Sequence, residues 1–421
     1  MEKDILKRII AEKQAEILKI ELIKRPIVLE PAANYVFVGL RRAGKSYMMY
    51  QHILEMIQAG QASITDILYI NFEDERIGPV KAEALGLLLD AYKEMFDSTP
   101  LIFLDEIQNI IGWEKFARRL ADAKYRVFIT GSNAKMLSKE IYTTLGARFI
   151  AREIFPFSFK EYLAYHKVVL DKNWEYNDLR TQVIKLFQGY FYWGGFAESF
   201  VINDKRSWLN PLYQKILLGD IILRNDIRNE NAIRMLVKKL AESVMQPSSL
   251  SRIKNIVDST GSTVSRNTLI DYLRFLTDAY LVFGISNFSD KMGDKETFKK
   301  RYFFDNGLLN NFLFDSETKL LENLVAIDLK KRYGKNLYYY NRNVEVDFFI
   351  PNERMAIQVS YSMANEATRQ REITALLKLS KVYYLDRLEI ITFDEESTVQ
   401  VNGVVIKVIP VWKYLLKNEQ I

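Results

Sequence analysis

The sequence predicts an α/β protein whose first part is built on a parallel β-sheet. Between residues 34 and about 156, five short apolar runs alternate with helical stretches. The runs are continuously apolar, which is typical of strands covered by helices on both faces of a parallel sheet. A glycine-rich turn joins the first run to the first helical stretch. We therefore expect repeated strand–helix units that bury one sheet between two helical layers.

A chain of 421 residues is too long for one ordinary core, so we expect two to four domains. From residue 3 to about 24, apolar positions recur among Lys and Glu as they do in a surface helix. The expected division is an N-terminal helix at 1–24, the sheet domain at 25–156, a helical extension at 157–230, a unit of short helices and a strand at 231–301, and a last α/β domain at 302–421.

The composition limits the possible chemistry. Hydrophobic residues make up 48% and charged residues 27% of the chain, as in globular proteins. The absence of cysteine excludes disulfides, thiolate metal sites and cysteine nucleophiles. The two histidines, His52 and His166, are too few to favour a histidine metal site or a Ser-His-Asp triad. Any chemistry must therefore use carboxylates, Lys, Arg, hydroxyls or a bound metal.

Charge and hydropathy limit the partners and the location. The net charge of +6 is small for this length, so it permits nucleic-acid binding without arguing strongly for it. No apolar run approaches the roughly 20 residues that a bilayer span needs. The N-terminal sequence lacks the apolar region and small-residue cleavage site of a signal peptide. We therefore expect a cytoplasmic protein without a membrane partner.

The stretch "VFVGLRRAGKSYMMY" at 36–50 contains the spacing Gly-x-x-x-x-Gly-Lys-Ser between a strand and a helix. Such a loop wraps phosphates because its glycines let the backbone approach and its N–H groups point inward. In this spacing Lys45 would reach the β- and γ-phosphates of ATP, and Ser46 would ligate Mg²⁺. The alternative is a turn without a ligand. The expected nucleotide-binding residues are Gly39, Leu40, Arg41, Arg42, Ala43, Gly44, Lys45, Ser46 and Tyr47, although salt bridging suits Arg41 and Arg42 equally well.

A second motif, "LIFLDEIQ" at 101–108, places two carboxylates directly after a buried strand. Asp105 would bind the Mg²⁺ ion through its water, and Glu106 would act as the general base or orient the attacking water. Taken alone, an acidic pair after a strand is also common as a helix N-cap. The phosphate loop upstream favours the nucleotide site.

Two further candidates follow the next strands. The strand "RVFITGSN" ends in Ser132 and Asn133, which could lie beside the γ-phosphate or could cap the helix "AKMLSKEI" at 134–141. Arg148 precedes the following strand and could stabilise the transition state as an arginine finger. Glu106, Asn133 and Arg148 are therefore the expected catalytic residues, with Ser132 in the nucleotide site and Ser46 and Asp105 as metal ligands.

With these residues identified, the first part of the chain resembles the AAA+ class of P-loop ATPases, with the "RVFITGSN" strand inserted between the two nucleotide motifs. More narrowly, "GLRRAGKS", "FLDEIQ", "ITGSN", "FPFSFKEYL" and "YFYWGGFAE" look like a prokaryotic AAA+ family of unknown function. The resemblance covers nearly the whole chain. It implies a P-loop NTPase sheet with a helical extension, a winged-helix domain and a C-terminal domain of restriction-endonuclease-like α/β fold. That family usually has Gly-Arg where this chain has Ala147 between Gly146 and Arg148.

The implied winged helix lies at 231–301. Its second amphipathic helix would turn Leu269, Tyr272, Leu273 and Leu276 inward and Arg266, Asn267 and Arg274 outward. A basic wing for DNA could be formed by Lys291, Lys295, Lys299, Lys300 and Arg301. The alternative is a winged helix that serves only protein packing.

The implied endonuclease-like domain would need carboxylates and a lysine to hold Mg²⁺ against a phosphodiester. Glu322 and Asp347 match the first two positions. The third element should be Glu-x-Lys, but Gln358 and Ser360 stand there, so we expect a catalytically degenerate domain. Strands are expected around it, including one at 381–386.

The sequence thus predicts an AAA+ protein that binds ATP and Mg²⁺ and hydrolyses ATP, with nucleotide state controlling the winged helix and C-terminal domain. One alternative is a DNA-associated module that uses ATP as a structural ligand, and a weaker one is a Mg²⁺-dependent nuclease. DNA or a client protein could be the partner. The oligomeric state is left open.

Overall fold

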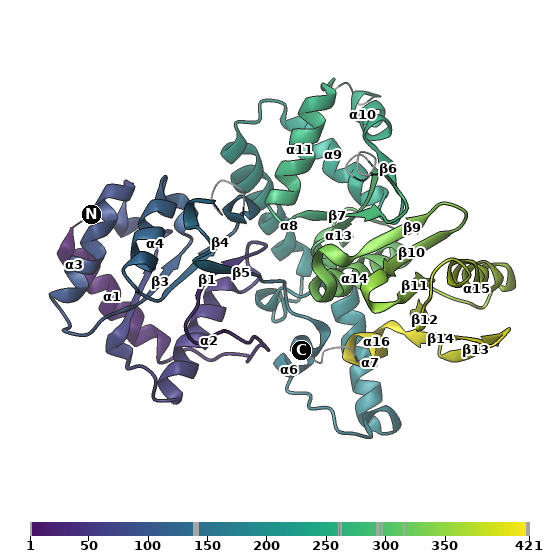
Figure 1. Ribbon diagram of the computed structural model, residues 1–421, viewed down its shortest axis with the longest axis horizontal. Coiled ribbons are helices and arrows are strands. Elements are labelled where there is room, and N and C mark those ends of the chain that lie inside the picture. Colours follow the sequence, from purple (N-terminus) through teal and green to yellow (C-terminus); the bar gives the residue numbers. More distant parts are fainter. Residues whose placement is uncertain are drawn as a thin grey trace. The chain divides into compact units, whose positions relative to one another are not determined.

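The computed structural model describes residues 2–137, 143–259, 261, 263–291, 295, 298–314 and 316–417. The chain forms two compact units (Figure 1). Unit 1 comprises Met1–Phe155 with Asp278–Tyr280, and unit 2 comprises Pro156–Thr277 and Leu281–Ile421. In the described part of the chain, no helix is long and apolar enough to cross a bilayer.

Unit 1 contains a five-stranded sheet in the order β2-β3-β4-β1-β5, and every neighbouring pair is parallel. The parallel sheet expected from the sequence is therefore confirmed. The strand that carries Ser132 and Asn133, β4, lies between the strands that precede the two nucleotide motifs, as expected. The strands are β1 (Asn34–Val38), β2 (Ile67–Asn71), β3 (Leu101–Asp105), β4 (Val127–Gly131) and β5 (Phe149–Glu153).

The helices of unit 1 surround this sheet (Figure 1). They are α1 (Lys3–Ile17), α2 (Lys45–Gln58), α3 (Leu87–Lys93) and α4 (Trp113–Asp122). Short 3₁₀ turns lie between them at η1 (Ile64–Asp66), η2 (Glu75–Ile77), η3 (Ala82–Gly86), η4 (Ile107–Asn109) and η5 (Ala134–Leu137).

The N-terminal helix is shorter than predicted. It ends at Ile17 rather than near residue 24, and it packs on β2 and α3 through Leu6, Ile9 and Ile10. The segment that follows cannot continue the helix to Pro26, because the residue before a proline is biased towards extended backbone. That residue, Arg25, pairs its backbone N–H and C=O with the Gln51 side chain at 2.8 and 2.9 Å.

Unit 2 contains a nine-stranded mixed sheet in the order β13-β14-β12-β11-β10-β9-β7-β8-β6. Its parallel pairs are β11 with β12, β12 with β14 and β7 with β9, and its other pairs are antiparallel. The strands are β6 (Ser248–Ser249), β7 (Val282–Asn287), β8 (Phe298–Phe303), β9 (Tyr338–Asn341), β10 (Glu345–Ile350), β11 (Met355–Val359), β12 (Arg387–Thr392), β13 (Ser397–Val401) and β14 (Val404–Pro410).

The helices of unit 2 are α6 (Phe159–Tyr165), α7 (Asp178–Trp193), α8 (Lys205–Lys215), α9 (Glu230–Glu242), α10 (Leu250–Ser259), α11 (Arg266–Asp278), α13 (Asn306–Asn310), α14 (Glu317–Tyr333), α15 (Glu366–Ser380) and α16 (Val411–Lys417). Leu269, Tyr272, Leu273 and Leu276 of α11 are buried. A π-helical turn, η8 (Ile216–Ile222), and further 3₁₀ turns at η6 (Trp174–Tyr176), η7 (Ala197–Ser199), η9 (Leu223–Asn225), η10 (Gly334–Asn336) and η11 (Pro351–Glu353) complete the unit.

Two sequence predictions for unit 2 were wrong. The domain boundary at 301/302 falls inside β8, because β7 and β8 join the same sheet as β9 to β14. The segment 381–386 is not a strand but the connection between α15 and β12. Tyr383 of this segment packs against the core cluster that includes Phe349 and Leu379, whereas Tyr384 is 75% exposed.

Candidate functional site

The glycine-rich loop runs from the end of β1 at Val38 to the start of α2 at Lys45. Gly39 and Gly44 have φ values of 149° and 91°, which only glycine adopts easily. A Cβ on Gly39 would lie 2.1 Å from the carbonyl oxygen of Ile154. The glycines therefore let this loop curve tightly against β5. The N-terminus of α2 has no side-chain cap, so its first N–H groups are suited to an anion.

Lys45 is folded over this loop. Its Nζ donates to the carbonyl oxygens of Gly39 and Leu40 at 3.2 and 3.1 Å, and it lies 3.9 Å from Oε1 of Glu106. The side chain is only 4% exposed. The structure therefore brings the loop lysine and the predicted general base together, with the ammonium able to exchange loop carbonyls for a phosphate.

The remaining loop residues occupy different environments. Leu40 and Ala43 are buried, Arg42 is exposed with φ of 65°, and Arg41 pairs with Glu73 at 3.0 Å. The pairing of Arg41 matches the salt-bridging alternative. In the first turn of α2, Ser46 is half-buried and Tyr47 is 53% exposed.

Asp105 is held by two neighbours that the sequence analysis missed. Tyr69 on β2 donates to Oδ2 of Asp105 at 2.6 Å, and Thr130 on β4 donates to Oδ1. Burial, with the charge of Asp105, raises the pKa of Tyr69 well above 10, so its phenol stays protonated and donates. The available signal was a hydroxyl residue in each apolar strand beside β3.

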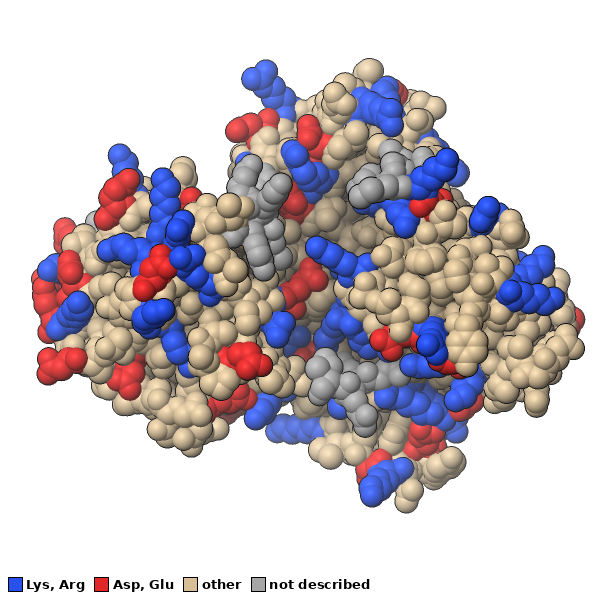
Figure 2. Space-filling model, in the orientation of Figure 1, with Lys and Arg blue, Asp and Glu red and all other residues tan. Residues whose placement is uncertain are grey.

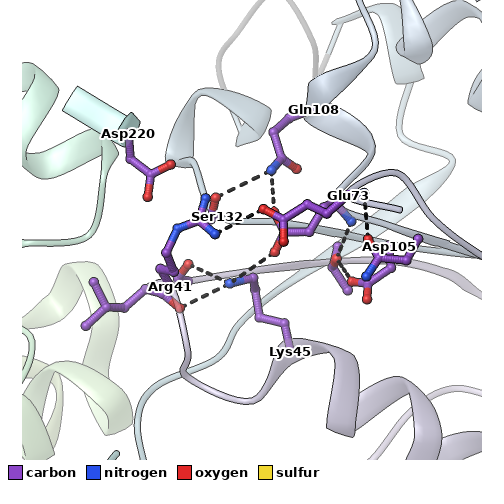
Figure 3. Close-up of polar contacts among 12 residues, drawn as sticks. Arg41, Lys45, Glu73, Asp105, Gln108, Ser132 and Asp220 are labelled. Carbon is purple, nitrogen blue, oxygen red and sulfur yellow. Dashed lines mark hydrogen bonds and ion pairs between the residues drawn. The ribbon is translucent and has the colours of Figure 1, made fainter. Parts of the chain in front are cut away.

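Glu106 directly follows in a strained conformation. Its φ is 52°, in the left-handed region that non-glycine residues seldom adopt. Its N–H donates to Oγ1 of Thr130 at 2.9 Å, and its carboxylate accepts a hydrogen bond from Gln108 (Figure 3). Gln108 also donates to Oγ of Ser132 at 3.4 Å. The Gln108 amide therefore links the side chain of Ser132 to that of Glu106.

Asn133 is 5% exposed, and its carbonyl oxygen accepts from the N–H of Met136 at 3.1 Å. The helix predicted at 134–141 begins as the turn η5, and residues 138–142 lie outside the described residues. The hydrogen bonds that the structure gives the Arg148 side chain go to Asp122 on α4 and to the carbonyls of Leu145 and Gly146. The role of Arg148 as an arginine finger stays a prediction.

Arg25 is a further residue that the sequence analysis missed. Its guanidinium donates to the carbonyl oxygen of Ala43 in the loop at 3.0 Å and to that of Phe155 at 2.9 Å. Phe155 is the last residue of unit 1 before the chain enters unit 2. Arg25 is only 7% exposed, so one buried cation ties the glycine-rich loop to the point where the chain leaves the unit.

The predicted basic wing is corrected by the position of Lys300. This side chain is fully buried, and its Nζ lies 2.9 Å from Asp347, 3.1 Å from Glu345 and 3.7 Å from Glu322. Lysines cannot easily be buried without such partners. On the face shown in Figure 2, basic and acidic side chains are interspersed, in keeping with the net charge of +6.

The structure brings Glu322 and Asp347 together around that ammonium. Burial lowers the pKa of Lys300. The negative charges of Asp347, Glu322 and Glu345 raise it by more than burial lowers it, so the net shift is upward. Burial raises the pKa of Glu322 to about 8, and its Oε1 accepts from Tyr302 at 2.7 Å. The three carboxyl groups thus surround a lysine that the sequence analysis assigned to a surface.

The side chains of Gln358 and Ser360 have structural roles near this cluster. Gln358 accepts from the N–H of Asp347 at 2.8 Å and donates to Glu372 at 2.8 Å, and Ser360 donates to the carbonyl of Ser362 at 3.0 Å. Within the described ranges, no group of three or more His, Asp or Glu residues is arranged to hold a metal ion. In the described part of unit 2, Glu322 and Asp347 face the Lys300 ammonium, and the side chains of Gln358 and Ser360 bind other protein groups.

Comparisons with known proteins locate two family matches in the chain. Residues 33–163 match the family described as AAA domain, and residues 184–319 match a domain of unknown function, DUF8612. The "Uncharacterized protein MJ1544" of Methanocaldococcus jannaschii is 35% identical over 416 residues, covering 94% of this chain and 92% of that protein. An "Uncharacterized protein" of Haemophilus influenzae is 29% identical, covering 78% and 82%.

Solved structures with partial similarity include the Aeropyrum pernix ORC1 protein in complex with DNA. It is 16% identical with a TM-score of 0.29, covering 77% of this chain and 93% of that chain. AMPPCP-bound DnaA from Aquifex aeolicus is 16% identical with a TM-score of 0.25, covering 64% and 87%.

Proposed function

The chain belongs to the same family as the Methanocaldococcus jannaschii protein MJ1544, and we propose that it binds and hydrolyses ATP. Residues 33–163 are its nucleotide-binding AAA+ domain. The observation that carries the proposal is the meeting of Lys45, Asp105 and Glu106 at one edge of the sheet, beside the uncapped start of α2. A phosphate-binding cation, a metal-binding carboxylate and a base are the groups that ATP hydrolysis requires.

Each side chain has a distinct task in this proposal. The loop N–H groups and Lys45 bind the phosphates, and Ser46 with Asp105 would hold Mg²⁺, which neutralises charge on the phosphates when it is bound. Tyr69 and Thr130 fix both oxygens of Asp105 in place. Glu106 takes a proton from the attacking water, an effect worth roughly 10²–10⁴ in rate.

We propose further that nucleotide state controls unit 2. Arg25 supports this, because it holds the loop carbonyl of Ala43 and the carbonyl of Phe155 at the same time. A phosphate that draws Lys45 off the loop carbonyls would change the loop beside Arg25. In unit 2, the order α9, β6, α10, α11, β7 and β8 supports a winged helix as the element that responds, and the sheet continues into the C-terminal part.

The test measures binding of ATP with Mg²⁺ by calorimetry and turnover by phosphate release. We expect Lys45→Ala to lose ATP binding, and Glu106→Gln to keep binding while turnover stops. Lys115→Ala, which removes an exposed lysine on α4, is the control and should match wild type. The proposal fails if the wild-type protein neither binds nor hydrolyses ATP.

A further inference from the structure

Gln108 occupies a position in this site that the AAA+ motifs do not explain. It lies in the 3₁₀ turn η4, two residues after Glu106, and the left-handed conformation of Glu106 turns the chain back so that the two side chains meet. Its amide nitrogen donates to Oε2 of Glu106 and, at 3.4 Å, to Oγ of Ser132 (Figure 3). The amide therefore links the base after β3 to the hydroxyl after β4.

The orientation of this amide follows from its partners. Only the NH₂ group can donate to a carboxylate, so the Gln108 carbonyl oxygen Oε1 must point the other way. That oxygen is buried, and among the residues that the structure describes it has no hydrogen-bond partner. The oxygen lies close to Gly131 instead, which fixes the plane of the amide and therefore the direction in which its NH₂ group points.

The neighbouring strand leaves room for this amide. A Cβ on Gly131, the last residue of β4, would lie 2.6 Å from Oε1 of Gln108 and 1.8 Å from Sδ of Met136. The φ of Gly131 is not in the left-handed region, so backbone conformation does not demand glycine there. The glycine of "ITGSN" is therefore explained by the space that Gln108 and Met136 occupy.

We propose that Gln108 is a positioning residue, whose NH₂ group holds the Glu106 carboxylate in the orientation in which it takes a proton from the water that attacks ATP. This rests on the proposed ATPase function. The water oxygen bonds to the γ-phosphorus, the bond from that phosphorus to the β–γ bridging oxygen breaks, and one water proton passes to Glu106. The products are ADP and inorganic phosphate.

Gln108→Met tests this, because methionine is similar in length but offers neither an amide donor nor a carbonyl acceptor. Turnover of ATP with Mg²⁺ gives kcat and KM, and calorimetry with a slowly hydrolysed ATP analogue gives Kd. We expect kcat to fall about 10²-fold with Kd unchanged, since the lost contact is made to the base rather than to the phosphates. Asn109→Ala, an exposed change in the same turn, is the matched control and should keep wild-type kcat.

A second variant keeps the inference testable if Gln108→Met folds poorly. Gly131→Ala retains Gln108 but displaces its carbonyl oxygen, so it should reproduce the loss of kcat without loss of binding. Wild-type kcat in either folded variant would overturn the role of Gln108 and leave the ATPase proposal standing. A wild-type protein that binds no ATP would instead overturn the ATPase proposal, and with it this inference.

Discussion

The phenol of Tyr69 donates a hydrogen bond of 2.6 Å to Oδ2 of Asp105, which joins the middle of β2 to the carboxyl end of β3. Both side chains are fully buried. A hydrogen bond to a charged group contributes about 1.5–3 kcal/mol, compared with about 0.5–1.5 kcal/mol for a neutral pair. We therefore expect Tyr69→Phe to lower the free energy of unfolding of unit 1 by about 1.5–3 kcal/mol.

The matched control for Tyr69→Phe is Tyr92→Phe. The Tyr92 phenol donates to a neutral acceptor, the carbonyl oxygen of Thr65, at 2.7 Å. Denaturant-dependent hydrogen exchange of β2 and β3 peptides measures both changes within unit 1. Equal losses in the two variants would show that the charge of Asp105 does not strengthen the Tyr69 bond.

Lys300 should be the most costly single lysine to remove from unit 2. Lys300→Met leaves Asp347 and Glu345 without the cation that lies within 2.9 and 3.1 Å, and breaking a buried ion pair in this way costs about 3–5 kcal/mol. Lys254→Met is the control, since its partner Asp258 lies at the surface and such pairs contribute about 0–1 kcal/mol. Chemical denaturation measures the free energy of unfolding of both variants. If Lys300→Met loses no more stability than Lys254→Met, the prediction is wrong.

The parallel sheet and the nucleotide loop could be predicted because their signals are local. Strands β1 to β4 are largely apolar runs. Of the proposed site residues, Asp105 ends β3, Glu106 follows it directly, and Lys45 begins the helix after the loop that follows β1. Parallel strands place their carboxyl ends at one edge, so sequence order alone brought those residues together. No knowledge of distant contacts was needed.

The supporting residues escaped prediction because their partners are distant in sequence. Tyr69 looks like any strand tyrosine until Asp105 lies beside it. Lys300 sits in "FKKRYF", where strand alternation places it on the face of Tyr302, away from Lys299 and Arg301. That alternation was a usable signal, but burial of a lysine there requires Glu322 and Asp347 from other elements, which one sequence does not reveal.

Arg25 offers a test of coupling between the glycine-rich loop and the chain that enters unit 2. Arg25→Met removes the donors to the carbonyls of Ala43 and Phe155, so the loop and the chain exit should exchange amide hydrogens faster. We expect weaker ATP binding, by about tenfold, and a smaller nucleotide-dependent change in the exchange of residues 156–165. Lys24→Met, which removes an exposed partner of Glu55, is the control. If the nucleotide-dependent change in hydrogen exchange is the same in Arg25→Met as in wild type, Arg25 does not contribute to the coupling.

Asp305 should make the stability of unit 2 depend on pH. Its carboxylate is buried and accepts from the N–H groups of Gly195, Gly307 and Leu308 at 2.8, 2.8 and 3.2 Å. Burial, which outweighs these hydrogen bonds, raises the pKa of Asp305 from 3.8 to about 6. Because the folded pKa exceeds the unfolded one, the stability that Asp305 contributes is complete below the unfolded pKa and is lost as pH rises through about 6.

Asp305→Asn isolates this effect from other titrating groups. The asparagine cannot ionise, but its NH₂ group would oppose one of the backbone N–H donors, so the variant should be less stable at low pH. We expect the stability difference between wild type and variant to narrow by about 2 kcal/mol between about pH 4 and pH 7. Urea denaturation across that interval measures the difference. A constant gap would mean that the Asp305 carboxyl titrates alike in the folded and unfolded chains.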